Sequence, residues 1–233
     1  MTVSRTLRIK LTATCTPLLA GLLIAVLNGT SVYAQGQQGN CGPLRVADQF
    51  GPYDYRTERG KNLHLVESAH FMPEVEALIR GNRGARVGAE LDYTLRTFPN
   101  HHRALLAMVR LSEKLKSPAP DGARYTVECW FTRAIQFAPD DTTVLLLFAE
   151  YLGKNNRQSE ATKQLEWVTV LAKENGFTYY NIGLVYFDMK LYDRALASAH
   201  RALALGFDRT ELRNRLESVG QWKEPSATPA PAN

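Results

Sequence analysis

The chain has 233 residues, of which 28 are lysine or arginine and 23 are aspartate or glutamate, for a formal net charge of +5. The first 34 residues hold three basic residues and no acidic one, so the remainder carries a net charge of only +2. This small, unclustered excess argues against a nucleic-acid-binding protein, for which a basic face is expected. At this length the chain can form one domain or two.

The N-terminus has the three parts of a secretory signal peptide. Three basic residues precede an apolar run from 17 to 27, and the small residues Val32 and Ala34 follow it. The run is shorter than the ~20 residues that a membrane-spanning helix needs. We therefore predict that 1–34 is a signal peptide cleaved after Ala34, that the protein is periplasmic or secreted, and that no transmembrane segment remains after cleavage.

Two cysteines lie beyond the predicted cleavage site, Cys41 and Cys129. An exported chain meets an oxidising environment, so an even cysteine count favours a disulfide between them, with two free thiols as the alternative. The segment 35–67 contains Gly-Pro turns and no clean helical period. We expect it to be irregular and to pack on the region that follows, held there by the disulfide.

Helical patterns begin near residue 68. A first helix is expected from Pro73 to Gly81, and a later one starts after Pro99 with the adjacent pair His101-His102. Neighbouring residues on a helix point about 100° apart, and no partner stands at a metal-ligand spacing. We interpret the two histidines as a surface pair at a helix start.

The clearest pattern lies between residues 179 and 206. Apolar or small residues recur there at spacings of three, four and seven, first around Tyr186 and then around Ala199, with a short connection at 189–193. Each set of recurring apolar residues predicts a helix with one apolar side. The short connection predicts that the two helices pack as an antiparallel pair. Shifted back by 34 residues, the same pattern falls on Leu145, Phe148, Ala149, Leu152, Ala161 and Val168.

The spacing Tyr-x-x-Ile-Gly-x-x-Tyr at 179–186, followed by Ala195 and Ala202, resembles the tetratricopeptide repeat. The resemblance implies an all-α fold, a right-handed superhelical stack of antiparallel helix pairs that forms an α-solenoid. It is clearest in the last two of about four units, 68–101, 102–141, 142–175 and 176–209. Residues 210–222 are expected to form a capping helix and 223–233 a disordered tail. The positions assigned to packing are Phe131, Pro139, Ala161, Gly183, Tyr186, Ala195 and Ala202.

In this family the first helix of each unit lines a concave groove that receives a peptide or an extended segment of a partner. The resemblance therefore implies such a groove here, and its arginines, lysines and one asparagine would suit a peptide with acidic groups. A solvated charged face without a ligand is the alternative. The candidate groove residues are Glu76, Arg80, Arg103, Arg110, Lys114, Leu146, Glu150, Lys154, Phe177, Tyr180, Asn181, Leu184 and Asp188.

The sequence contains no phosphate-binding glycine loop, no nucleophile elbow and no zinc-type cysteine or histidine motif. We therefore expect no catalytic residue, no metal, no cofactor and no small-molecule substrate. The predicted function is a non-catalytic, exported scaffold that binds a protein or peptide partner in the cell envelope. The alternative is an accessory or regulatory subunit of an envelope enzyme, transporter or polysaccharide assembly machine. The identity of the partner and the oligomeric state stay open.

Overall fold

A computed structural model describes residues 41–45 and 49–225. These residues belong to one compact unit. The predicted signal peptide and residues 226–233 of the predicted tail lie outside the described residues. Within the described ranges the protein is all-helical, with ten α-helices and no strand, which confirms the all-α prediction.

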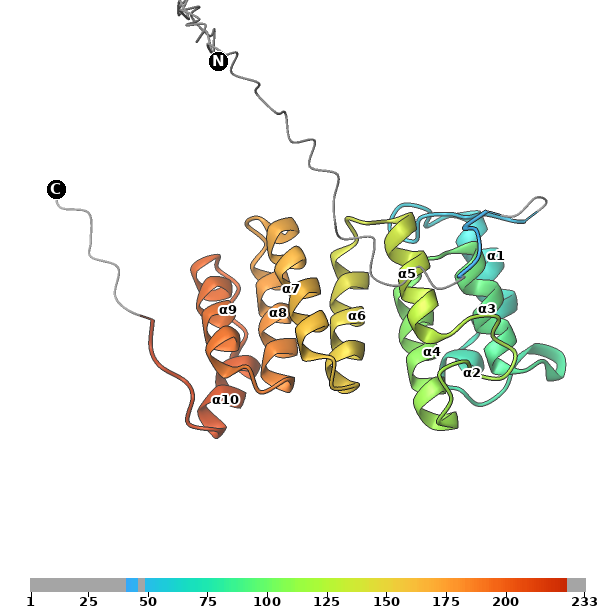
Figure 1. Ribbon diagram of the computed structural model, residues 1–233. Helices are drawn as coiled ribbons and strands as arrows, with labels where there is room; N and C mark the ends of the chain where they lie inside the picture. The colour runs from blue at the N-terminus through green and yellow to red at the C-terminus, as the bar shows by residue number, and fades with distance from the viewer. Residues whose placement is uncertain (1–40, 46–48, 226–233) are drawn as a thin grey trace, which may run out of the picture. The chain divides into compact units, whose positions relative to one another are not determined.

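Most of the helices are joined by short turns, and longer connections lie between α2 and α3 and between α4 and α5 (Figure 1). A short 3₁₀ turn, η2, covers Asn82–Gly84 between α2 and α3. The α-helices are α1 (Lys61–His70), α2 (Pro73–Glu76), α3 (Val87–Thr97), α4 (His102–Leu115), α5 (Val127–Phe137), α6 (Thr142–Lys154), α7 (Gln158–Ala172), α8 (Gly176–Asp188), α9 (Tyr192–Ala204) and α10 (Thr210–Ser218).

Consecutive helices pack as pairs, and the pairs pack on one another. The helices α6 and α7 form one closely packed pair, and α8 and α9 form another. In addition, α4 contacts α6, α6 contacts α8, and α8 contacts α10. The first helices of successive pairs therefore lie side by side, as expected for an α-solenoid.

Side chains at the helix starts fix where the helices begin. The carboxylate of Asp141 accepts hydrogen bonds from the backbone N–H groups of Thr143 and Val144 at the start of α6. The hydroxyl of Thr126 and the amide oxygen of Asn175 cap α5 and α8 in the same way. Such caps satisfy backbone donors that the first helical turn leaves without partners.

One apolar core runs through the pairs, from Phe71 before α2 to Leu216 in α10. The residues expected to pack are buried there: Phe131, Ala161, Gly183, Tyr186, Ala195 and Ala202. Pro139 is exposed in the turn between α5 and α6, where it follows the end of the helix. Gly183 lies so close to α10 that an added Cβ atom would stand 2.4 Å from the Leu212 Cδ2 atom.

The first helix pair differs from the prediction. The helix expected from Pro73 to Gly81 is wrong in extent, because α2 ends at Glu76 and Leu78 adopts a left-handed backbone with φ of 57°. In addition to α2, a helix that was not predicted, α1, packs against α3, and it starts inside the segment expected to be irregular. The helix α1 forms there because Leu63 and Val66 pack with Tyr55 and Phe98 in a second small core.

The N-terminal segment is tied to the helices at several points. A disulfide joins Cys41 to Cys129 of α5, which confirms the predicted pairing. The buried Arg133 guanidinium donates hydrogen bonds from Nη1 to the backbone carbonyls of Cys41, Gly42 and Pro43. Further along, the Tyr53 backbone N–H donates to the Thr97 carbonyl at 2.8 Å. This segment therefore packs on the helices as expected.

Candidate functional site

The solvent side of α4, α6 and α8 carries most of the residues that the sequence predicts for a groove. We call this surface the first-helix face and define it by Arg103, Arg110, Glu150, Lys154, Asn181, Leu184 and Asp188. Within each helix these residues are separated by three, four or seven positions, so they share one side of it. Because the three helices contact one another in succession, the face is continuous across them.

Electrostatic contacts confirm that the three helices meet on this side. The Lys154 ammonium lies 2.7 Å from the Glu150 carboxylate, one turn earlier on α6. The pKa of Lys154 is raised, chiefly by the hydrogen bond to Glu150 and further by the charges of Glu113 on α4 and Asp188 on α8. Asp188 in turn forms an ion pair with Arg215 of α10. Charges from four helices therefore meet at this end of the face.

A second ion pair lies at the other end of the first-helix face. The Arg103 Nε atom donates to Glu76 Oε1 at 2.8 Å, and the guanidinium also approaches Glu67 of α1 at 3.5 Å. The hydrogen bond from Arg103 is the main cause that lowers the pKa of Glu76. The structure thus brings together two predicted groove residues, but it uses them to neutralise each other.

Arg110 stands apart from these pairs. It is exposed near the middle of α4 and contacts no carboxylate within the described ranges. On α8, the Asn181 side-chain nitrogen donates to the Phe177 carbonyl at 2.9 Å, and Leu184 is half-buried beside it. The first-helix face therefore presents one unneutralised cation together with an amide and an apolar side chain.

Two predicted groove residues lie elsewhere. Arg80 is outside any helix, in the loop after α2, where it approaches Glu74 at 3.6 Å. Tyr180 is 6% exposed, so the prediction that it faces a groove is wrong. Its hydroxyl donates to Glu211 of α10 at 3.0 Å, and burial raises its pKa. Tyr180 is buried because α10 packs against the side of α8 on which it lies.

Lys114 also differs from the prediction, because its ammonium turns toward the first helix pair. The Nζ atom donates to the backbone carbonyl of Leu78 at 3.0 Å. This contact places Lys114 at the end of α4, beside the loop that follows α2.

The two histidines belong to two polar groups that the sequence did not reveal. His101 was expected on the surface but is 0% exposed, which corrects that prediction. Its Nδ1 atom accepts a hydrogen bond from the Ala104 backbone N–H and so caps α4, while Nε2 lies 3.1 Å from Glu67 Oε1. The ring of Tyr55 stacks on the imidazole at 4.1 Å between centroids. His101 thus holds the N-terminal segment and α1 against α4.

His102 belongs to a second polar group around Asp141. Its Nε2 atom lies 2.9 Å from Asp141 Oδ2. The Asn100 side-chain nitrogen donates to both Asp54 and Asp141, at 2.7 and 2.9 Å. The Arg56 guanidinium pairs with Asp54 and keeps the pKa of that carboxyl well below its usual range. These contacts join three loops and leave little of the group open to a ligand.

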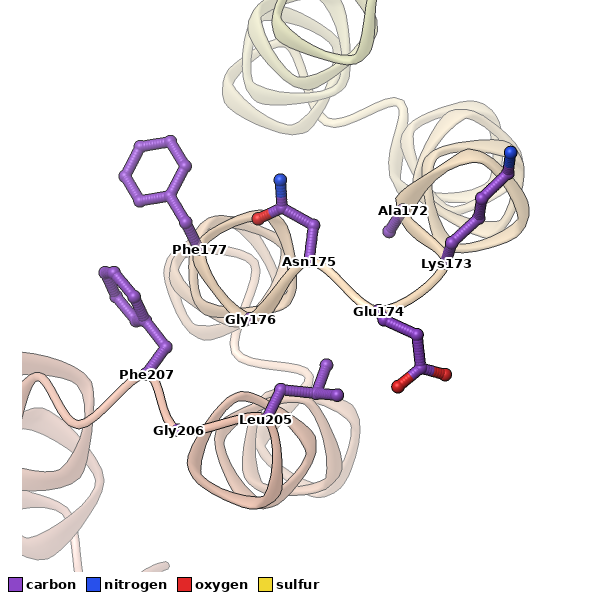
Figure 2. Close-up of a pocket in the computed structure, with 9 residues that line it drawn as sticks. All are labelled: Ala172, Lys173, Glu174, Asn175, Gly176, Phe177, Leu205, Gly206 and Phe207. Atoms are coloured by element: carbon purple, nitrogen blue, oxygen red, sulfur yellow. The ribbon is translucent and has the colours of Figure 1, made fainter.

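A shallow recess of about 540 Å³ lies where the α7–α8 and α9–α10 connections meet. Phe177 and Phe207 stand together on one side, and Lys173 and Glu174 lie on the other (Figure 2). The close approach depends on Gly176, where an added Cβ atom would stand 2.7 Å from Phe207 Cβ. Because Phe177 is 57% exposed at the start of α8, the recess extends the first-helix face with an apolar corner.

The described residues contain no group of three His, Cys, Asp or Glu side chains that could hold a metal ion. In the same ranges no helix is both long and apolar enough to cross a membrane. Comparison with models of protein families, with curated proteins and with solved structures finds no match for this chain.

Proposed function

We propose that this protein is an exported, tetratricopeptide-like helical-repeat protein that binds a protein or peptide partner in the cell envelope through the first-helix face. In this proposal the chain carries out no chemistry of its own. The repeat assignment is supported by the antiparallel helix pairs and by the contacts between successive first helices. The disulfide between Cys41 and Cys129 supports an oxidising compartment and, with it, the cleaved signal peptide.

The observation that carries the binding role is the exposed guanidinium of Arg110 on a face whose other charges are paired. Arg103 is neutralised by Glu76, and Lys154 by Glu150. An extended segment with an acidic side chain could pair with Arg110 without first breaking an internal ion pair. Asn181 and Leu184 on α8 would then contact the polar backbone and an apolar side chain of the same segment.

The test compares Arg110→Glu with the matched control Lys163→Glu, which reverses an exposed charge on the second helix α7. Each variant, immobilised after a circular dichroism check of its fold, captures proteins from an envelope extract. We expect the protein captured by the wild type to bind Arg110→Glu about tenfold more weakly, a loss of ~1.4 kcal/mol. The control should bind it normally. Equal binding by both variants would exclude the first-helix face as the docking surface.

A further inference from the structure

Two loops at one end of the helix pairs form a single surface. The first, residues 77–86, connects α2 to α3. The second, residues 114–124, comprises the last two residues of α4 and most of its connection to α5 (Figure 1). Lys114 donates to the Leu78 carbonyl, and Arg86 Nη1 lies 2.9 Å from Asp121 Oδ1. The backbones also touch, because an added Cβ atom on Gly88 would stand 2.2 Å from the Asp121 carbonyl oxygen. We call these two segments the basic tip.

The basic tip concentrates positive charge. Three of its cations are paired with carboxylates, at Glu74, Asp121 and Asp92. The remaining three contact no carboxylate in the described ranges. When the carboxylates that contact the tip or directly precede it are also counted, six cations stand against five carboxylates: Asp121, Glu74, Glu90, Asp92 and Glu113. Its basic residues are Arg80, Arg83, Arg86, Lys114, Lys116 and Arg124, against the single acidic residue Asp121.

Apolar side chains project from the same surface. Ile79 is 72% exposed, the highest value among the large exposed hydrophobic residues of the described chain, and Leu115 is 47% exposed. Between Ile79 and the core lies Leu78, half-buried and with a left-handed φ of 57° that leucine rarely adopts. Because of this backbone turn, the Leu78 side chain packs against the core and the Ile79 side chain points into solvent.

We propose that the basic tip binds the surface of a lipid bilayer that contains anionic phospholipids. Ile79 and Leu115 would enter the boundary between head groups and acyl chains, while Arg83, Lys114 and Lys116 lie at the level of the phosphates. Exposed apolar side chains rimmed by lysine and arginine are suited to this interface, since burial of apolar area and attraction to anionic lipid add together. The tip adjoins the first-helix face, because Lys114 lies one turn after Arg110 on α4, so the same molecule could hold a protein partner near a membrane.

The test measures co-sedimentation with vesicles of phosphatidylcholine, with and without phosphatidylglycerol, at low and high salt. The protein used in this test starts at Gln35. It therefore lacks the apolar run of 17–27 and contains all of the described residues. We expect binding only to the anionic vesicles and weaker binding at high salt. Each cation near the surface changes the partition coefficient onto anionic vesicles about fivefold. The double variant Arg83→Glu, Lys116→Glu should therefore reduce this partition coefficient at least about 25-fold.

Matched control variants distinguish vesicle binding by the basic tip from nonspecific adsorption through other exposed side chains. Ile79→Ser should weaken vesicle binding several-fold, whereas Val170→Ser, another strongly exposed apolar residue, should not. Likewise, Lys163→Glu on α7 should bind vesicles like the wild type. The proposal is overturned if wild-type protein does not prefer anionic vesicles, or if the tip variants bind them unchanged. It is also overturned if those variants lose only a protein partner, because the tip would then dock a protein.

Discussion

His101 shows how one side chain can tie three parts of the fold together. Because its Nδ1 atom accepts the Ala104 N–H, that nitrogen carries no proton, and the proton sits on Nε2, which donates to Glu67. Tyr55 covers the ring on one side, and the Arg103 cation lies nearby. Burial is the main cause that lowers the pKa of His101, and the interaction with Glu67 only partly offsets it. The folded state therefore holds the imidazole in its neutral form.

Acid should destabilise the protein through this residue. As pH falls through 6.5, the ordinary value, the unfolded chain takes up a proton at His101 that the folded chain resists, so the free energy of unfolding decreases. Glu67, whose pKa is lowered chiefly by its hydrogen bond with His101, adds a loss of the same sign below pH 4.5. Urea unfolding at pH 7.5 and 5.5 measures the effect.

The control is His101→Asn, in which the amide oxygen replaces Nδ1 as the helix cap but cannot titrate. The stability of this variant should change less between the two pH values than that of the wild type. His101→Ala should be less stable than His101→Asn by about 1 kcal/mol at either pH, because it also loses the cap. An unchanged pH dependence in His101→Asn would rule out His101 as the titrating group.

None of these contacts could be predicted from the sequence. His101 and His102 follow a proline at a helix start, a position that is usually exposed, and no local pattern marks their partners. Those partners come from the N-terminal segment, from α1 and from the start of α6, all distant in the sequence. The sequence also could not say which cations of the first-helix face are neutralised, since Glu76 reaches Arg103 only through the fold.

At the scale of helices, prediction succeeded where one helix side carries many apolar residues. The pairs α6–α7 and α8–α9 have such stripes, and their packing follows directly from the spacing. In contrast, α1 buries only Leu63 and Val66, so its apolar stripe is too narrow to be recognised in the sequence. Tyr180 was assigned to the open side because α8 alone does not reveal that α10 covers it.

The contact between α8, α9 and α10 predicts a sharp size limit at Gly183. Leucine there must displace Leu212 of α10 and press on the Ala195 carbonyl of α9. We expect Gly183→Leu to lower the free energy of unfolding by about 1 to 3 kcal/mol. Ala197→Leu, which adds the same side chain on the exposed side of α9, should change stability by less than ~0.5 kcal/mol. Thermal unfolding of both variants by circular dichroism distinguishes them, and equal melting temperatures would contradict the assigned packing.

Across the described unit, ion pairs connect each helix pair to the next. Arg157 pairs with Glu128, Arg194 with Glu166, and Arg201 with Glu174. The paired residues are 27 to 29 positions apart, so each contact joins successive helix pairs only. The N-terminal segment is the exception, since it reaches from Cys41 to α5, from Asp54 to the start of α4 and from Arg56 to the start of α6.

This long-range connection makes the disulfide important for the whole unit. Cys41 and Cys129 are separated by 88 positions, and closing so long a loop should stabilise the folded state by about 4 to 5 kcal/mol in the chain-entropy model. Because a single core runs from Phe71 to Leu216, we expect reduction to lower the melting temperature of one cooperative transition. Calorimetry with and without reductant measures this shift. The variant with both Cys41→Ala and Cys129→Ala should melt at the reduced temperature in either buffer; if it melts with the oxidised wild type, the bridge adds nothing to stability.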